Sequence, residues 1–145
     1  SDPRPADDHR ERLYIVYARD SLGVFSKYSD DSGETWSAET MDIEGGTHPT
    51  INRGIDGTLV KMAYVAGSPG VLHGVVRRSG DEDWSDVFVL KDDFGANLLV
   101  QDDTFHLVEG LEGPGRWVLV VMLDGETSPS EWTTSDEFRT LRRVV

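Results

Sequence analysis

Three segments of this chain repeat the same order of features, and no other property of the sequence constrains its fold as strongly. Each segment has an apolar strand, a turn rich in Gly, Ser or Pro, a second strand and then an acidic turn. The segments begin at Leu13, Thr58 and Trp117. Their acidic turns carry Asp31, Asp81 and Asp136, which are 50 and then 55 residues apart. A period of about 50 residues, built from short strands, predicts one four-stranded propeller blade per repeat.

Short apolar or alternating runs, separated by turn sequences such as DDSG, GIDG and EGPG, recur along the whole chain. No apolar helical period extends over a dozen residues, so the sequence predicts an all-β protein joined by hairpins. The predicted strands cover residues 12–18, 23–28, 49–52, 58–64, 71–78, 86–90, 98–101, 105–109, 116–123, 130–134 and 140–144.

The first acidic turn, SDDSGETWS, has the residues that a tight hydrogen-bonded loop needs. We expect the Asp31 carboxylate to accept two or three N–H groups that lack strand partners, with Ser29 and Thr35 bonding across the loop base. Gly33 permits a positive φ at the sharpest point. Trp36 is expected to return a large apolar side chain to the core of the blade. These features predict a structural fastener, not a chemical site.

The pattern S-x-D-x-G-x-T-W at residues 29–36 resembles the Asp-box, or BNR repeat, of the sialidase-like β-propellers. The second repeat contains a shortened copy and the third a copy with Phe138 in place of glycine. The positions in register are Ser79, Asp81 and Trp84 in the second copy and Thr134, Asp136, Thr140 and Leu141 in the third, where Leu141 replaces the tryptophan. In that family the box is a hairpin between the third and fourth strands of a blade, on the outer rim. The resemblance therefore implies a structural role for all three turns.

The resemblance covers residues 12–145, with blades expected at 12–47, 48–95 and 96–145, and residues 1–11 form a polar N-terminal tail. Sialidase-like rings have six blades, so three blades leave an open arc. We expect protein subunits or the remainder of a parent chain to complete the ring, two copies of three blades giving six. The start SDPRPADDHRER, without an initiator Met, favours a fragment or processed piece. A compact β-sandwich of the same hairpins is the alternative fold.

The best-known proteins of the resembled family are enzymes with an arginine triad, a Tyr–Glu nucleophile pair and an Asp acid/base. Their first arginine lies in a RIP-like motif, which has no match here. The candidate side chains for such a site are Arg19, Arg53, Arg77, Tyr14, Tyr17, Tyr28 and Tyr64. Tyr17 and Tyr64 alternate along predicted strands, which favours packing between blades. No catalytic set is predicted, and part of a sialidase-like glycoside hydrolase remains the alternative function.

Other chemistries receive less support from the sequence. His48, His73 and His106 stand singly and the chain has no cysteine, so we expect no metal site and no cofactor. Surface Ca²⁺ at residues 91–93 or 101–103 remains an alternative. The net charge of −13 opposes binding to nucleic acid, and no apolar run approaches the length that membrane insertion needs.

These observations together predict a non-catalytic structural and binding module. Its expected role is protein assembly, or attachment to a glycan or a surface, in a secreted, virion or appendage component. The fold analogy is the source of this ligand class.

Overall fold

The computed structural model of the chain describes residues 12–67, 70–109 and 115–145, so the polar tail predicted at residues 1–11 lies outside the described residues. Every named element is a β-strand and every named strand pair is antiparallel, which confirms the predicted all-β class. No helix that could span a membrane is found in the described part of the chain.

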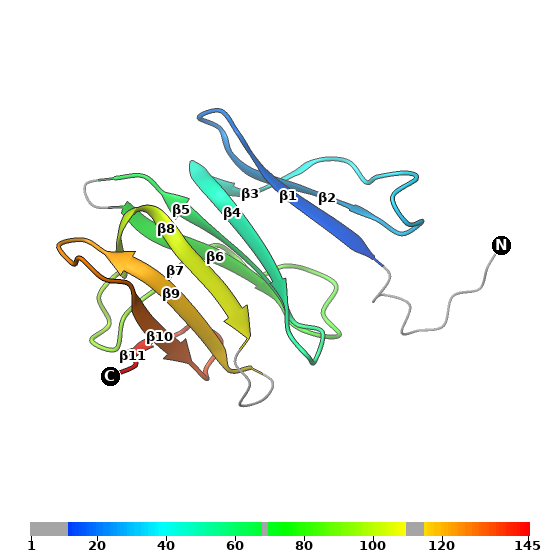
Figure 1. Cartoon of the computed structure of the whole chain (residues 1–145). Helices are drawn as coiled ribbons and strands as arrows, with labels where there is room; N and C mark the ends of the chain where they lie inside the picture. Colours follow the sequence, from blue (N-terminus) through cyan, green and yellow to red (C-terminus); the bar gives the residue numbers. More distant parts are fainter. Residues whose placement is uncertain (1–11, 68–69, 110–114) are drawn as a thin grey trace.

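The strands form three consecutive blades (Figure 1). The first blade contains β1 (Leu13–Arg19), β2 (Gly23–Ser29) and β3 (Thr40–Glu44), hydrogen-bonded in that order. The second contains β4 (Gly46–Arg53), β5 (Leu59–Val65), β6 (Gly70–Arg77) and β7 (Phe88–Val89). The third contains β8 (Leu99–Glu109), β9 (Trp117–Leu123), β10 (Ser130–Thr134) and β11 (Arg142–Arg143). A short pairing of β6 with β8 joins the second and third blades into one eight-stranded sheet.

Three details of the strand prediction are wrong. The sequence does not predict β3, because only one of its side chains, Ile43, is fully buried and the others are polar or exposed. The strands predicted at 98–101 and 105–109 are one strand, β8, whose register against β9 shifts between Val100 and Phe105. The strands predicted at 86–90 and 140–144 shorten to the two residues of β7 and the two residues of β11.

The predicted four-stranded count holds for the second and third blades, whereas the described part of the first blade has three strands.

The corner between β1 and β2 depends on Gly23, which has a φ of 147°. A Cβ atom there would lie 2.4 Å from the Ile43 carbonyl oxygen, so only glycine lets β2 pair closely with β3 at this end.

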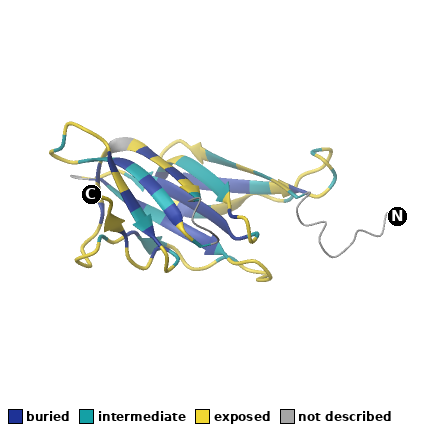
Figure 2. Ribbon diagram, turned by 60° about the horizontal axis from the view of Figure 1, so that its bottom comes forward, coloured by how far each residue is buried: buried dark blue, intermediate teal, exposed yellow. Residues whose placement is uncertain are grey.

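The blades pack face to face through two apolar clusters. The larger one joins the second and third blades, for example through Val60 and Met62 of β5 and Leu119 of β9, all fully buried. The smaller one joins the first and second blades and consists of Val24, Ile43 and Ala63. Figure 2 shows buried residues concentrated in the sheet of the second and third blades. The first blade is therefore attached through less apolar contact than the other two share.

Candidate functional site

The Asp31 turn, residues 29–36, connects β2 to β3 and is closed by its own side chains. The Ser29 hydroxyl donates to Asp31 Oδ1 at 2.7 Å and accepts from the Gly33 N–H at 2.9 Å. Thr35 donates its N–H to Asp31 Oδ1 at 2.8 Å and its hydroxyl to Oδ2. The Thr35 bonds, followed by the Ser29 bond, lower the pKa of Asp31 to about 2.

The Asp136 turn, residues 134–141, connects β10 to β11 with the same bonds. The Thr134 hydroxyl donates to Asp136 Oδ1 at 2.7 Å, and Thr140 donates its N–H and hydroxyl to the two carboxylate oxygens at 3.1 and 2.7 Å. Burial opposes ionisation of Asp136, but the bonds from Thr140 and Thr134 outweigh it and lower its pKa. The two turns are therefore the same structure, although their sequences share few residues.

Phe138 occupies the position that Gly33 has in the Asp31 turn. Both residues have positive φ, 70° for Phe138 and 92° for Gly33, which is an unusual conformation for a phenylalanine. The Phe138 side chain is 2% exposed and lies 5.7 Å from the Trp117 ring and 6.4 Å from the Phe88 ring, centroid to centroid. Packing between the second and third blades thus compensates the backbone strain.

The Asp81 turn, residues 79–84, is two residues shorter and differs in its bonds. The Asp81 N–H donates to the Arg78 carbonyl at 3.0 Å, whereas none of the described residues donates a hydrogen bond to its carboxylate. The Ser79 hydroxyl instead lies against Gly57, 3.1 Å from where a Cβ atom would stand. Asp81 holds the motif position of Asp31 but not its bonds, because the shortened loop has no threonine to donate to it.

A second feature of the first turn is retained after the Asp81 turn. Ser85 donates its N–H to the Val76 carbonyl at 2.8 Å, and its Oγ accepts the Val76 N–H at 3.0 Å. Ser37 and Tyr28 make the same two bonds at the same distances in the first blade. The serine that follows each tryptophan therefore closes the loop onto the preceding strand in both blades.

The prediction that Trp36 is buried in a blade core is wrong, because its side chain is 38% exposed. Its indole N–H donates to the Gly33 carbonyl at 3.1 Å, which lays the ring over the turn. The equivalent residue of the third blade, Leu141, is fully buried against the second blade. No described blade precedes the first one, so the face that carries Trp36 has nothing to pack against.

A cavity of about 200 Å³ lies between the first and second blades. Its walls include Tyr14 of β1, Asp42 of β3, Lys61 of β5, Arg77 of β6 and Trp84 of the Asp81 turn. Lys61 Nζ lies 2.9 Å from Asp42 Oδ1 and 3.9 Å from the centre of the Trp84 ring. The Lys61 and Asp42 side chains are 3% and 6% exposed, and burial lowers the pKa of Lys61 despite its carboxylate partner. We call this space the inter-blade cavity.

Three buried side-chain atoms, on residues that line this cavity, make no hydrogen bond of normal geometry. They are the Tyr14 hydroxyl, Asp42 Oδ2 and Arg77 Nε, and the described residues contain no other buried side-chain polar atom in this state. The Arg12 guanidinium binds Asp30 at 2.7 Å from Nε to Oδ1, and this bond, followed by the interaction of Arg12 with Tyr14, raises the pKa of Arg12. All three atoms therefore belong to residues of this one cavity.

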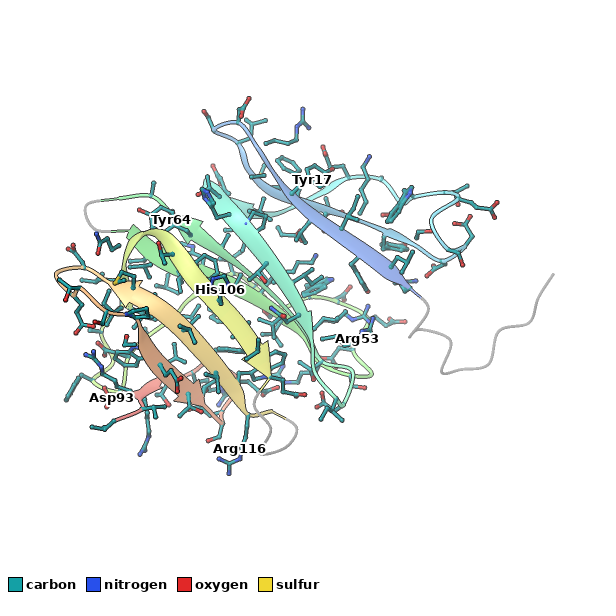
Figure 3. The ribbon with its side chains drawn as sticks, viewed as in Figure 1. Tyr17, Arg53, Tyr64, Asp93, His106 and Arg116 are labelled. Carbon is teal, nitrogen blue, oxygen red and sulfur yellow. The ribbon has the colours of Figure 1, made fainter. Side chains whose placement is uncertain are left out.

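Of the seven arginines and tyrosines considered for a sialidase-like site, Tyr14, Tyr28 and Arg77 line the inter-blade cavity, and the other four lie outside it. Figure 3 shows Tyr17, Arg53 and Tyr64 at separate positions on β1, β4 and β5. Arg19 Nη1 binds Glu39 at 2.7 Å. Of the three candidate arginines, only Arg77 lines the inter-blade cavity.

The hydroxyl of Tyr17 donates to Glu39, and its ring stacks on Phe25 with centroids 6.3 Å apart. This hydrogen bond is the main cause of the raised pKa of Tyr17 and of the lowered pKa of Glu39. The alternation of Tyr17 along its strand predicts packing between two blades. In the structure Tyr17 instead lies on the open face of the first blade, which no described blade covers.

The histidines also lie apart, and His73 has a pKa lowered by burial. Within the described ranges, no group of three or more His, Asp or Glu side chains is placed to hold a metal ion. In the segment at 91–93, Asp92 Oδ1 already accepts the N–H groups of Phe94 and Ala96, both at 3.0 Å. The side chains of residues 102 and 103 lie outside the described part.

No protein-family model and no curated protein matches this chain. Among solved structures, it is similar to the crystal structure of the intramolecular trans-sialidase from Ruminococcus gnavus in complex with oseltamivir carboxylate. That similarity has a TM-score of 0.55 and 18% identity, and it covers 94% of this chain. The chain spans about a third of the trans-sialidase chain, of which 32% is covered. The comparison therefore supports the fold alone, that of a segment of a sialidase-like β-propeller.

Proposed function

We propose that this chain is a non-catalytic segment of a sialidase-like β-propeller that mediates protein assembly, with attachment to a glycan or a surface as its biological outcome. The observation that carries the proposal is the exposed face of the first blade. In a propeller each blade packs on its neighbours, and an uncovered apolar blade face is a surface for a further blade.

The repeated turns define which positions of the blades are equivalent. Leu13 pairs with the first residue of the Asp31 turn as Trp117 pairs with the first residue of the Asp136 turn, so Ile15 corresponds to Leu119. Trp117 and Leu119 are 1% and 0% exposed against the second blade, whereas Leu13 and Ile15 are 44% and 43% exposed. The first blade therefore presents the same kind of face without its partner.

The edge of the first blade adds a second means of association. β1 pairs only with β2 in the described structure, so one side of its backbone is free to pair with another strand. A blade supplied by a second copy, or by another part of a longer chain, would cover both the edge and the apolar face. Two copies of three blades would give a ring of six.

The three acidic turns take a structural role in this proposal, the Asp31 turn as a complete Asp-box and the Asp81 and Asp136 turns as degenerate copies. The hydroxyl and amide donors of the Asp31 and Asp136 turns are used within the turn itself. A carboxylate that is engaged in this way fixes the path between the third and fourth strands of a blade and is not free for catalysis.

Light scattering after size-exclusion chromatography tests the assembly role. We expect the chain to form a monodisperse dimer and Ile15→Asp to give a monomer, because the charge would be buried at the new contact. Ile55→Asp is the matched control, since Ile55 is 79% exposed in the β4–β5 turn and away from this face. A stable wild-type monomer that binds no hydrophobic dye would overturn the proposal.

A sialidase-like hydrolase is the second candidate function, and the Tyr17–Glu39 contact is the observation that favours it. A tyrosine that donates to a carboxylate has the arrangement of an activated nucleophile and its base. The raised pKa of Tyr17 weighs against this role, because its phenol holds the proton more tightly. Turnover of a fluorogenic sialoside by the intact protein, abolished by Tyr17→Phe, would favour the hydrolase over the assembly module.

A further inference from the structure

We propose that the exposed face of the first blade binds the outward face of the third blade of a second copy of this chain, so that two copies associate head to tail. The inference rests on the assembly role proposed above and adds to it the surface that covers the first blade. Figure 1 shows the first and third blades at opposite ends of the row of blades. Each copy therefore offers one face at each end.

The third blade has an uncovered apolar face on the side turned away from the second blade. On β9, Trp117 and Leu119 point toward the second blade and are buried in the shared cluster. Val118 and Val120 alternate with them, so they point to the other side, and both are only partly buried. Val108 of β8 lies opposite Val118 and is 54% exposed. We call the surface of Val108, Val118, Val120 and the neighbouring Glu131 the third-blade face.

The contact between the second and third blades shows how two such faces fit together. The strand registers, with the serine bonds that follow the first two turns, make Met62 of the second blade equivalent to Val120 of the third. Met62 is fully buried in the cluster that these two blades share, and Leu119 lies in the same cluster from the facing side. Leu119 corresponds to Ile15 by its strand register. Val120 and Ile15 therefore hold the two positions of this contact, at the two ends of the chain, and no described blade covers either.

Each face also carries one charged side chain close to its apolar centre. Lys27 lies opposite Ile15 in the pairing of β1 with β2. Glu131 lies opposite Val120 in the pairing of β9 with β10. Directly opposite residues of an antiparallel pair point to the same side of the sheet. Neither Lys27 nor Glu131 forms a salt bridge with a described residue. We call the surface of Leu13, Ile15 and Lys27 the first-blade face.

The other charges on these two sides of the molecule are paired or lie at the edge. Glu39 interacts electrostatically with Lys27, but it already binds Arg19 at 2.7 Å. Arg142 lies on the edge strand β11, at the rim of the third-blade face. The first-blade face therefore keeps the positive charge of Lys27 beside its apolar centre, and the third-blade face keeps the negative charge of Glu131.

These charges select the head-to-tail arrangement. Contact between two first-blade faces would bring two lysines together, and contact between two third-blade faces would bring two glutamates together. Like charges in a contact oppose association, whereas opposite charges favour the correct partner. A first-blade face against a third-blade face pairs Lys27 with Glu131. Two such contacts, related by a two-fold axis, use both faces of both copies and leave neither uncovered.

Charge reversal tests this arrangement by light scattering after size-exclusion chromatography. Lys27→Glu and Glu131→Lys should each convert the dimer to a monomer of 16.1 kDa, because each places like charges at both contacts. The double variant Lys27→Glu/Glu131→Lys exchanges the two charges and should be a dimer again. Lys91→Glu is the matched control and should stay dimeric, since Lys91 is exposed and lies outside both faces.

Circular dichroism of each variant establishes that it is folded. We expect all of them to keep the wild-type spectrum, because both side chains lie on the surface of the single chain. Single variants that remain dimeric, or a folded double variant that stays monomeric, would overturn the head-to-tail contact.

Cross-linking locates the contact without a change of charge. The chain has no cysteine, so Ile15→Cys/Val120→Cys places one thiol on each face. A short bismaleimide should link this double variant into covalent dimers. Each single Cys variant should stay unlinked, because every contact then holds only one thiol. Covalent dimers of Ile15→Cys alone would mean that two first-blade faces meet, and would overturn the proposal.

Failure of this contact and failure of the assembly role give different results. A wild-type dimer that Ile15→Asp breaks but Glu131→Lys does not would leave the assembly role standing and refute the third-blade face as the partner. A wild-type monomer that binds a hydrophobic dye would assign the uncovered faces to another part of a longer chain and refute the second copy. A monomer that binds no dye would refute both proposals.

Discussion

Phe138 gives the sharpest test of the physical account, because two effects act on it in opposite directions. Its side chain is 2% exposed between Trp117 and Phe88, so Phe138→Ala should lower the free energy of unfolding by about 3–5 kcal/mol. Its φ of 70° costs a residue with a Cβ atom about 1–2 kcal/mol, and alanine does not relieve that cost.

Phe138→Gly loses the same ring but relieves the backbone strain. The relief of about 1–2 kcal/mol offsets the greater chain entropy of an unfolded glycine, about 0.5–1 kcal/mol. We therefore expect the Gly variant to be at least as stable as the Ala variant, by up to about 1.5 kcal/mol. At an ordinary buried position the order would be the opposite.

Urea denaturation of both variants, followed by circular dichroism, measures this order. Gly33→Ala is the matched control, because Gly33 has a φ of 92° and a Cβ atom there would come no closer than 3.8 Å to its neighbours. Only the backbone conformation can make that substitution costly, and we expect a loss of about 1 kcal/mol. If Phe138→Gly proved clearly less stable than Phe138→Ala, the assignment of strain to this turn would be refuted.

Further predictions concern the carboxylates and the buried ion pair. Asp31→Ala and Asp136→Ala should each lower the melting temperature, because each removes the acceptor of three turn bonds. Asp81→Ala should change the melting temperature little. Equal losses at all three sites would contradict the difference between the turns. The pKa of Asp31 is lowered to about 2 and that of Asp136 is also lowered, so their stabilisation is complete above the unfolded value of 3.8 and is lost as the pH falls toward 2. Acid titration of the melting temperature should therefore be shallower in the double Ala variant, and parallel curves would contradict the linkage. Lys61→Met should lower the free energy of unfolding by about 3–5 kcal/mol, because it leaves Asp42 buried and unpaired. Adding Asp42→Leu should recover most of this loss, as measured by urea denaturation. A double variant no more stable than the single one would refute the pairing.

The sequence by itself determined the β class, the three repeats and the position of most strands. These properties are local: alternation selects strands, turn residues end them, and the Asp, Ser and Thr of an acidic turn bond to atoms only a few residues away. For this reason the Asp31 and Asp136 turns could be predicted, and Thr140 could be matched to Thr35 despite a changed glycine and tryptophan. The shortened copy matches the same pattern at Asp81, but none of the described residues donates to that carboxylate, because a loop two residues shorter lacks the threonine donor.

Only the tertiary structure decided which faces of the blades are covered. Trp36 and Leu141 hold equivalent places in their turns, yet one is 38% exposed and the other fully buried, because a neighbouring blade packs on the third blade and none of the described strands packs on that face of the first. The sequence likewise did not predict the inter-blade cavity. Tyr14, Asp42, Lys61 and Arg77 lie on four strands of two blades and meet only when those blades pack together. Burial and pairing across such distances depend on the whole fold, and local patterns carry no information about them.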